Sequence, residues 1–456
     1  MRVARLAARL AALTPRTKRL LGTTVASYLA RLASAGVMLL TIPMARRVLD
    51  AELFGLWMML GSLLAFFAFA DFGLGNGLMN RISVALHRGH HAEVSRMMVA
   101  GYFCTLVCGF LLCGSWIAWV VLNTDPLRFA GRIAPAHQTE AQWAFSTLVL
   151  LVALGLPIQI TQKLQLAHQQ GHWVGLAHLA SALGTLVLLP LGLTLGWSLP
   201  VLLLCTLGLQ VLVTGGCALV WLARCRQFGP LRHARLETSA ITRLLRTGSL
   251  FFVLQLSAAF AFQSDAFVIT QLMGTAAYGD YAAIQRLFLS MSALVGAALL
   301  GLWPAFAEAL ARGDVPWARK AFVRSMALGF VVMGTLCMAI TLGTPWLSQH
   351  WLGMSSPPSM MLPVLLSVWA VLETLGQISG TLLNGAGIVR AQVFIAVLMS
   401  ATAFAGKWLL VAEFGTWGAV LATIVAYSLI TVPTVLWLLR RMFSGRGGIA
   451  PASALS

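Results

Sequence analysis

The sequence predicts an all-α polytopic membrane protein with twelve transmembrane helices in two six-helix lobes. Three observations support this prediction. Of the 456 residues, 59% are apolar and only 10% are charged, and the mean hydropathy is +0.85. The apolar residues fall in runs of about 18 or more, the length that a helix needs to cross a bilayer. The two halves of the chain also repeat each other in register.

The predicted helices alternate with short connections that leave no room for a soluble domain. Their predicted ranges are 21–45, 53–70, 97–122, 143–162, 173–195, 199–222, 248–272, 281–306, 321–343, 360–382, 388–411 and 415–440. The formal net charge of +18 would be typical of a protein that binds nucleic acid. However, this hydropathy is far above that of soluble nucleic-acid-binding proteins, so no nucleic-acid partner is expected.

Lys and Arg residues lie mostly on one side of the predicted membrane. That side carries 24 of them, the other side carries 4, and the positive-inside rule then places both termini in the cytoplasm. The predicted segments are a basic amphipathic N-terminus on anionic lipid (1–20), an N-terminal lobe (21–222), a basic cytoplasmic linker (223–247), a C-terminal lobe (248–440) and a cytoplasmic tail (441–456).

The two halves align without gaps at an offset of 224 residues. Phe54-Gly55-Leu56-Trp57 aligns with Tyr278-Gly279-Asp280-Tyr281, and Ala85–Gly89 aligns with Ala309–Gly313. Each half holds six spans, an even number, so both halves have the same orientation. A parallel repeat of this kind is typical of transporters that alternate access to a central cavity.

Two segments resemble the Wzx-type polysaccharide flippases of the MOP superfamily, which have the MATE-like fold. The first is 54–89, which contains Asp71-Phe72-Gly73-Leu74-Gly75-Asn76-Gly77, and the second is Tyr278–Leu287. The resemblance implies a flippase that moves an undecaprenyl-diphosphate-linked oligosaccharide to the periplasmic leaflet of the bacterial inner membrane, for O-antigen or exopolysaccharide assembly. It also implies a polysaccharide polymerase and a chain-length regulator as partners, and no cofactor beyond a coupling H⁺ or Na⁺. Lipid II is a less expected cargo, because lipid II flippases of this superfamily usually have two further C-terminal helices.

Three cations lie within predicted spans: Arg31, Arg286 and Lys407. Each costs about 2.5–3.5 kcal/mol at a lipid-exposed helix centre, so each is expected to face a cavity or a partner. Guanidinium suits a diphosphate because its planar fork binds two oxygens at once. The alternatives are structural pairing of Arg31 and snorkelling of Lys407 to the interface.

Neutral polar residues extend this candidate substrate site. Gln255 aligns with Arg31 in the repeat, and Gln162 and Lys163 form a polar strip at the cytoplasmic end of their helix. That strip either meets an incoming headgroup or is simply solvated.

Three acids are candidates for coupling or gating. Asp265 and Arg286 are expected at similar depth, as an ion pair that is either structural or opened by the cargo. Glu373 is a lone mid-span carboxylate and therefore a candidate proton carrier, or else hydrogen-bonds to a neighbouring helix. Asp71 precedes a glycine-rich segment and is either a structural cap or part of a gating hinge.

Two other functions compete with the flippase. A MATE-type antiporter for cations or drugs would favour net acid in the cavity, whereas three acids balance three bases here. A polymerase or ligase needs a large outer loop, and the longest one, Asn123–Gln142, offers only Arg128 and Arg132 as strong candidates. The chain is therefore not expected to be an enzyme. With seven scattered cysteines and no Cys/His cluster, no metal site is expected.

Overall fold

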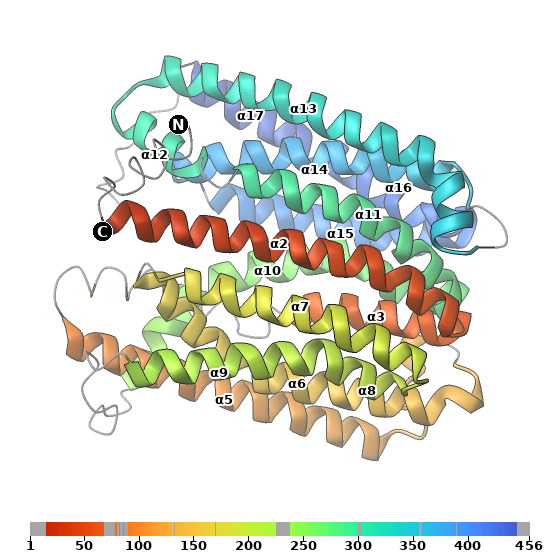
Figure 1. Cartoon of the computed structure of the whole chain (residues 1–456). Helices are drawn as coiled ribbons and strands as arrows, with labels where there is room; N and C mark the ends of the chain where they lie inside the picture. Colours follow the sequence, from red (N-terminus) through yellow and green to blue (C-terminus); the bar gives the residue numbers. More distant parts are fainter. Residues whose placement is uncertain are drawn as a thin grey trace, which may run out of the picture. The chain divides into compact units, whose positions relative to one another are not determined.

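The computed structural model describes residues 15–67, 78–79, 82, 85, 90–131, 133–168, 170–224, 238–299, 302–354, 358–388 and 390–444. Within these ranges every regular element is a helix (Figure 1). The elements are α2 (Pro15–Val48), α3 (Ala51–Phe67), α5 (His91–Leu122), η1 (Arg128–Ala130), α6 (Pro135–Ala167), α7 (His172–Thr194), α8 (Leu199–Leu203), η2 (Leu204–Gly208), α9 (Leu209–Arg224), α10 (Thr238–Met273), α11 (Thr275–Leu299), α12 (Leu302–Ala311), α13 (Val315–Trp346), η5 (Leu347–Trp351), α14 (Met361–Gly385), α15 (Arg390–Phe414), α16 (Trp417–Ala426), η6 (Tyr427–Thr431) and α17 (Val432–Phe443).

Each predicted span overlaps a helix or a run of joined helices from this set. Among the described residues, nine helices are long and apolar enough to cross a membrane. The apolar side chains also face outward: in α5, Phe110 is 76% exposed and Leu122 is 81% exposed. A helix that exposes apolar side chains in this way is stable when lipid surrounds it but not when water does. The protein is therefore a multi-pass membrane protein.

One predicted span is covered by two described helices. The range 281–306 is predicted as one helix, and α11 and α12 account for all of it except residues 300–301, which lie outside the described residues.

The chain forms two compact units. The first comprises Met1–Met44, Phe67–Pro126 and Gln138–Phe252, and the second comprises Ala45–Phe66, Leu127–His137 and Val253–Ser456. Nearly all of α3 thus groups with the second half of the chain. The predicted lobes 21–222 and 248–440 stay a prediction.

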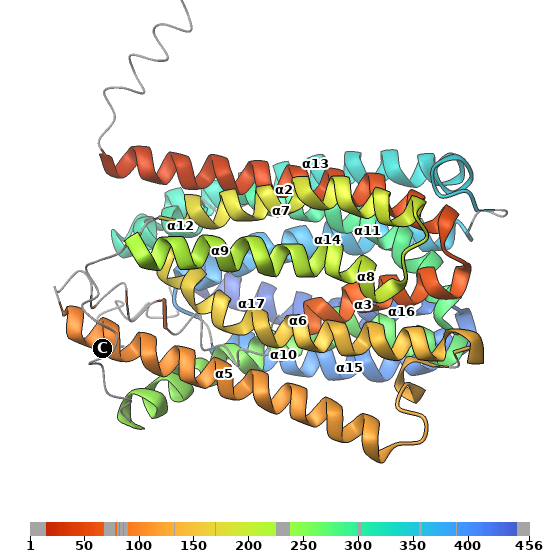
Figure 2. The same ribbon diagram turned by 60° about the horizontal axis from the view of Figure 1, so that its bottom comes forward.

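In the first unit, α5 and α6 lie side by side and run antiparallel (Figures 1 and 2). Tyr102 and Thr161 share a hydrogen bond of 2.6 Å, and Trp116 donates to Ser146 over 2.9 Å. A residue further along α5 thus bonds to a residue earlier in α6, so the two helices are antiparallel. This is expected of neighbouring helices joined by a short connection.

In the second unit, α3 and α11 pack together through equivalent residues of the repeat. A Cβ atom on Gly279 would lie 2.9 Å from the Cα of Gly55, and one on Gly55 would overlap the backbone carbonyl of Thr275. Seven residues further along each helix, Arg286 contacts Ser62 over 3.4 Å. Because both contacts join residues 224 apart, α3 and α11 run parallel, as the sequence repeat predicts.

Replacing Gly279 by valine should disrupt this helix pair. The new side chain meets both the backbone of α3 at Gly55 and the ring of Phe54, so we expect a loss of about 1–3 kcal/mol of stability. Thermal unfolding of the purified protein in detergent measures the loss. The matched control is Gly334→Val, because a Cβ on Gly334 has open space around it. Equal melting temperatures for the two variants would contradict the close packing.

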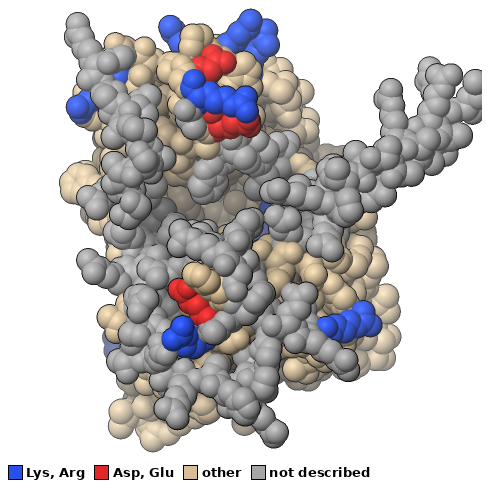
Figure 3. Space-filling model, turned by 90° about the vertical axis from the view of Figure 1, so that its left-hand side faces the viewer, with Lys and Arg blue, Asp and Glu red and all other residues tan. Residues whose placement is uncertain are grey.

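Basic side chains gather at the end of the second unit where α12 meets α13 (Figure 3). Arg319, Lys320 and Arg324 lie in the first turns of α13, and Arg312 pairs with Glu308 over 2.6 Å. The sequence predicts that all four of these bases lie on the cytoplasmic side, and this orientation stays a prediction.

Candidate functional site

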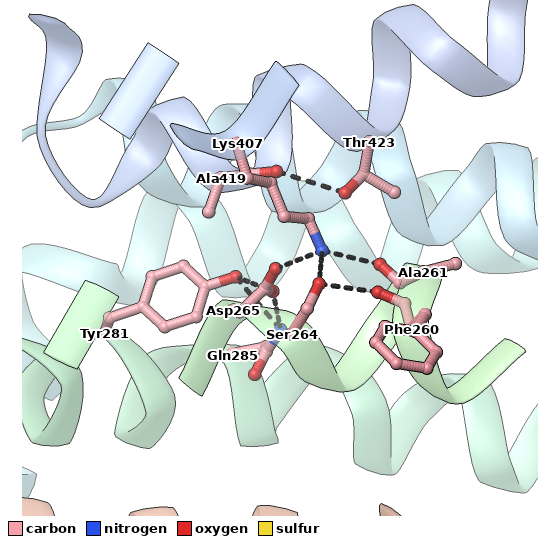
Figure 4. A network of polar contacts seen from close by, with 9 residues as sticks. All are labelled: Phe260, Ala261, Ser264, Asp265, Tyr281, Gln285, Lys407, Ala419 and Thr423. Carbon is pink, nitrogen blue, oxygen red and sulfur yellow. Dashed lines mark hydrogen bonds and ion pairs between the residues drawn. The ribbon is translucent and has the colours of Figure 1, made fainter. Parts of the chain in front are cut away.

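Lys407 of α15 is fully buried, with 0% of its surface exposed. Its Nζ lies 2.6 Å from Oδ1 of Asp265 in α10 and donates hydrogen bonds to the carbonyl of Ala261 (2.5 Å) and the hydroxyl of Ser264 (3.0 Å) (Figure 4). All three acceptors lie within one turn of α10. The three donors of the ammonium group are therefore all used.

The second oxygen of Asp265 is held by α11. Tyr281 donates its hydroxyl proton to Oδ2 over 2.6 Å, and Nε2 of Gln285 donates to the same atom over 3.1 Å (Figure 4). Tyr281 and Gln285 are four residues apart and so lie on one face of the helix. Oδ1 of Asp265 thus faces the ammonium group as an ion pair, while Oδ2 accepts two hydrogen bonds.

This network corrects two expectations from the sequence. Asp265 pairs with Lys407 and not with Arg286. Lys407 does not snorkel, because α15 continues to Phe414 and holds the side chain inside the unit. Sequence reasoning estimated depth along each helix but had no information on which helix faces which.

Arg286 of α11 lies half-buried beside α3. Its Nη2 atom contacts the hydroxyl of Ser62 over 3.4 Å, and that hydroxyl also bonds the hydroxyl of Tyr278 over 2.6 Å. Among the described residues, no carboxylate lies within ion-pair distance of Arg286. Within the described part of the chain its charge therefore has no ion-pair partner.

Two cavities lie next to each other in the second unit. The smaller, of about 150 Å³, has polar walls that include Ser62, Asp265, Tyr281, Gln285, Arg286, Ser292 and Glu373. The larger, of about 440 Å³, is lined by Ser257, Ala261, Phe262, Trp369, Glu373, Gly376, Gln377, Gly380, Leu383, Gln392, Ile395, Ala396, Met399, Tyr427, Thr431 and Val435. Phe262, Trp369 and Glu373 line both, so these three side chains form the boundary between the cavities.

Glu373 of α14 stands at this boundary. Nε2 of Gln377 contacts its Oε1 over 3.5 Å, while Oε2 is buried without a hydrogen-bond partner among the described residues. A buried acceptor without a partner is costly, so this oxygen is a ready acceptor for a proton or a ligand donor.

The other predicted site residues lie elsewhere. In the first unit, Arg31 is exposed on α2, and Gln162 and Lys163 are half-buried on α6. Gln255 of α10 is half-buried, and its Oε1 has no hydrogen-bond partner in the described part of the chain. Asp71 lies outside the described residues. The structure thus brings Asp265, Arg286 and Glu373 to one cavity wall and does not bring Lys407 there.

Sequence reasoning missed the aromatic residues of this site. Trp369, Glu373 and Gln377 follow each other at intervals of four on α14, so the helical spacing from Glu373 was the available signal. Tyr427 gave no such signal. It belongs to the π-helical turn η6, and Tyr427 and Thr431 both line the larger cavity.

Comparison with known proteins agrees with this architecture. The family model described as "Polysaccharide biosynthesis protein" matches residues 20–310. A Salmonella typhimurium (strain LT2) protein called "Putative O-antigen transporter" is 22% identical over 415 residues, covering 90% of this chain and 93% of that protein.

Solved structures share the fold at low sequence identity. An inward-facing multidrug resistance MATE family transporter of the MOP superfamily superposes with a TM-score of 0.72 at 17% identity, covering 90% of this chain and 98% of that one. A MOP superfamily transporter from Pyrococcus furiosus gives 0.63 at 15% identity, covering 94% and 96%.

The family match and the related transporters together support a transporter rather than an enzyme. The resemblance of its motifs and the parallel packing of α3 and α11 lead to the same assignment. The chain belongs to the polysaccharide biosynthesis protein family and is a membrane transporter of the Wzx type with the MOP/MATE fold.

Proposed function

We propose that this protein is a flippase that carries an undecaprenyl-diphosphate-linked oligosaccharide from the cytoplasmic to the periplasmic leaflet by alternating access, for O-antigen or exopolysaccharide assembly. The observation that carries the proposal is the guanidinium of Arg286, which has no ion-pair partner among the described residues, on a cavity wall at membrane depth. A cation in that position is costly unless an anion joins it, and the diphosphate of the cargo is such an anion.

The surroundings of Arg286 favour diphosphate over other anions. Its planar fork can bind two phosphate oxygens together. The nearby carboxylate of Asp265 is neutralised by Lys407 and repels an incoming anion little. Lys407, bonded on all three donors, is therefore a support for the site in this geometry rather than a ligand-binding group.

The remaining sequence candidates enter the proposal as contacts along the path. Arg31, Gln162, Lys163 and Gln255 are proposed to meet the polar headgroup, and Asp71 is proposed as a hinge. We further propose that both termini are cytoplasmic, that the membrane is the bacterial inner membrane, and that anionic lipid binds the basic ends. A polymerase and a chain-length regulator are the proposed protein partners.

One observation favours the alternative, a MATE-type antiporter of cations. The walls of the larger cavity carry the carboxylate of Glu373 and aromatic rings but no Lys or Arg among the described residues. A lipophilic cation would suit that composition.

Deletion of the gene followed by lipid analysis separates the two functions. For a flippase, undecaprenyl-diphosphate-linked oligosaccharide accumulates on the cytoplasmic leaflet and surface polysaccharide disappears. Expression of the wild-type chain should reverse both changes. Unchanged lipids together with increased sensitivity to cationic drugs would instead establish the antiporter.

Coupling is proposed to use Glu373, with Asp265 as the second candidate. The charged and titratable groups around the same cavity are Arg286, Asp265 and Tyr281, and Tyr427 lines the larger cavity together with Glu373. Glu373→Gln removes the titration but keeps the shape, so transport in vesicles should lose its response to an imposed proton gradient. A response equal to that of the wild type would remove Glu373 from the coupling mechanism, and Na⁺ replacement then tests the other ion.

A further inference from the structure

The larger cavity differs chemically from the smaller one. Its described walls present no cation, so a diphosphate has no counter-charge there. With about 440 Å³ it falls within the usual range of small-molecule sites, about 300–1,000 Å³. The cavity is nevertheless shaped by specific packing: a Cβ on Gly376 would overlap the hydroxyl of Tyr427, so only glycine leaves room for that ring.

Two polar side chains on these walls, Glu373 and Gln392, offer acceptor oxygens. Oε2 of Glu373 has no hydrogen-bond partner among the described residues. Gln392 uses its Nε2 atom to donate to Asn384 (2.9 Å) and to the carbonyl of Ile388 (2.6 Å), which leaves its Oε1 to accept. Acceptors of this kind select a ligand rich in O–H or N–H donors.

Aromatic rings complete the cavity. Trp369 packs against Phe262 with a centroid distance of 5.4 Å, and edge-on against Tyr427, also at 5.4 Å. The C–H face of a pyranose ring packs on such rings, while its hydroxyl groups donate to carboxylate and amide oxygens. Few other neutral ligands use both kinds of surface.

We propose that the larger cavity is a saccharide subsite, which holds the first sugar of the cargo while Arg286 holds the diphosphate. The proposal rests on the proposed flippase function and adds to it the location of the glycan. Phe262, Trp369 and Glu373 line both cavities, so a sugar attached to a diphosphate can occupy the two together. Trp369 is the platform for the sugar ring, and Glu373 and Gln392 accept its hydroxyl hydrogens.

Binding to the full-length protein in nanodiscs tests the subsite. The probes are undecaprenyl diphosphate and undecaprenyl-diphosphate-N-acetylglucosamine, which differ only in the sugar. We expect the sugar-bearing lipid to bind about tenfold more tightly to the wild type, and Trp369→Ala to remove that difference. Trp143→Ala is the matched control, because Trp143 is 65% exposed on α6 and lines neither cavity.

A second variant fills the cavity without clashing with backbone. A Cβ on Gly380 would make only an ordinary 3.7 Å contact with Gln392, so Gly380→Leu is expected to fold and to occupy the sugar space. It should abolish the preference for the sugar-bearing lipid and leave binding of undecaprenyl diphosphate intact. Arg286→Ala should weaken both lipids equally.

The outcomes distinguish the subsite from the function on which it rests. If both lipids bind equally and neither Trp369→Ala nor Gly380→Leu changes this, the saccharide subsite is refuted while the flippase stands. If neither lipid binds the wild type, the proposed function itself fails. If tetraphenylphosphonium binds and depends on Trp369 and Glu373 while the sugar has no effect, the cavity is a cation site and the subsite is overturned.

Discussion

Replacement of Arg286 by alanine is expected to abolish glycan export while the protein remains folded in the membrane. The guanidinium makes one long contact, to Ser62, and no described carboxylate depends on it. Replacing Arg286 by alanine should therefore reduce the stability of the folded protein only slightly. Transport loses two charge-assisted bonds to the diphosphate, each worth about 1.5–3 kcal/mol, so we expect at least about a hundredfold loss of affinity.

Surface polysaccharide in a deletion strain that expresses each variant measures this effect, with membrane levels of the protein as the internal reference. Arg286→Lys keeps the charge and loses the fork, so partial export is expected. Arg312→Ala is a suitable control, because Arg312 is exposed just after α12 and pairs with the exposed Glu308. Normal polymer output from Arg286→Ala would show that the diphosphate is held elsewhere.

Removal of Lys407 is expected to have the largest effect on stability. Lys407→Ala leaves the carboxylate of Asp265 buried without its counter-charge, and breaking a buried pair in this way costs about 3–5 kcal/mol. The variant should unfold at a much lower temperature in detergent or fail to accumulate in the membrane. Thermal unfolding followed by size-exclusion chromatography measures the shift.

The double variant Asp265→Leu, Lys407→Met tests whether the cost comes from the unpaired charge. Replacing a buried pair by apolar residues of similar size is often neutral, so the double variant should recover most of the stability. A double variant as unstable as Lys407→Ala alone would mean that packing, and not the ion pair, is responsible. If it is stable but inactive, the pair also contributes to transport.

Much of the architecture follows from properties that are distributed along the chain. Apolar runs of sufficient length predict helices in a membrane whatever their neighbours are. The offset of 224 residues predicts that equivalent helices of the two halves run in the same direction. The contacts of Gly55 with Gly279 and of Ser62 with Arg286 show this for α3 and α11. The cost of charge in lipid likewise singled out Arg286, Asp265 and Glu373, which share one cavity wall.

The sequence by itself thus determined the helical class, the membrane spans, the repeat and the small set of charges that need an explanation. The packing of the helices shows that Asp265 pairs with Lys407, that Arg286 has no carboxylate partner among the described residues, and that aromatic rings line a second cavity. The physical reason is that sequence patterns do not define how each helix is rotated about its own axis. Hydropathy and spacing place a residue along its helix, whereas its partner depends on how each helix is turned against its neighbours, which packing of the whole unit settles.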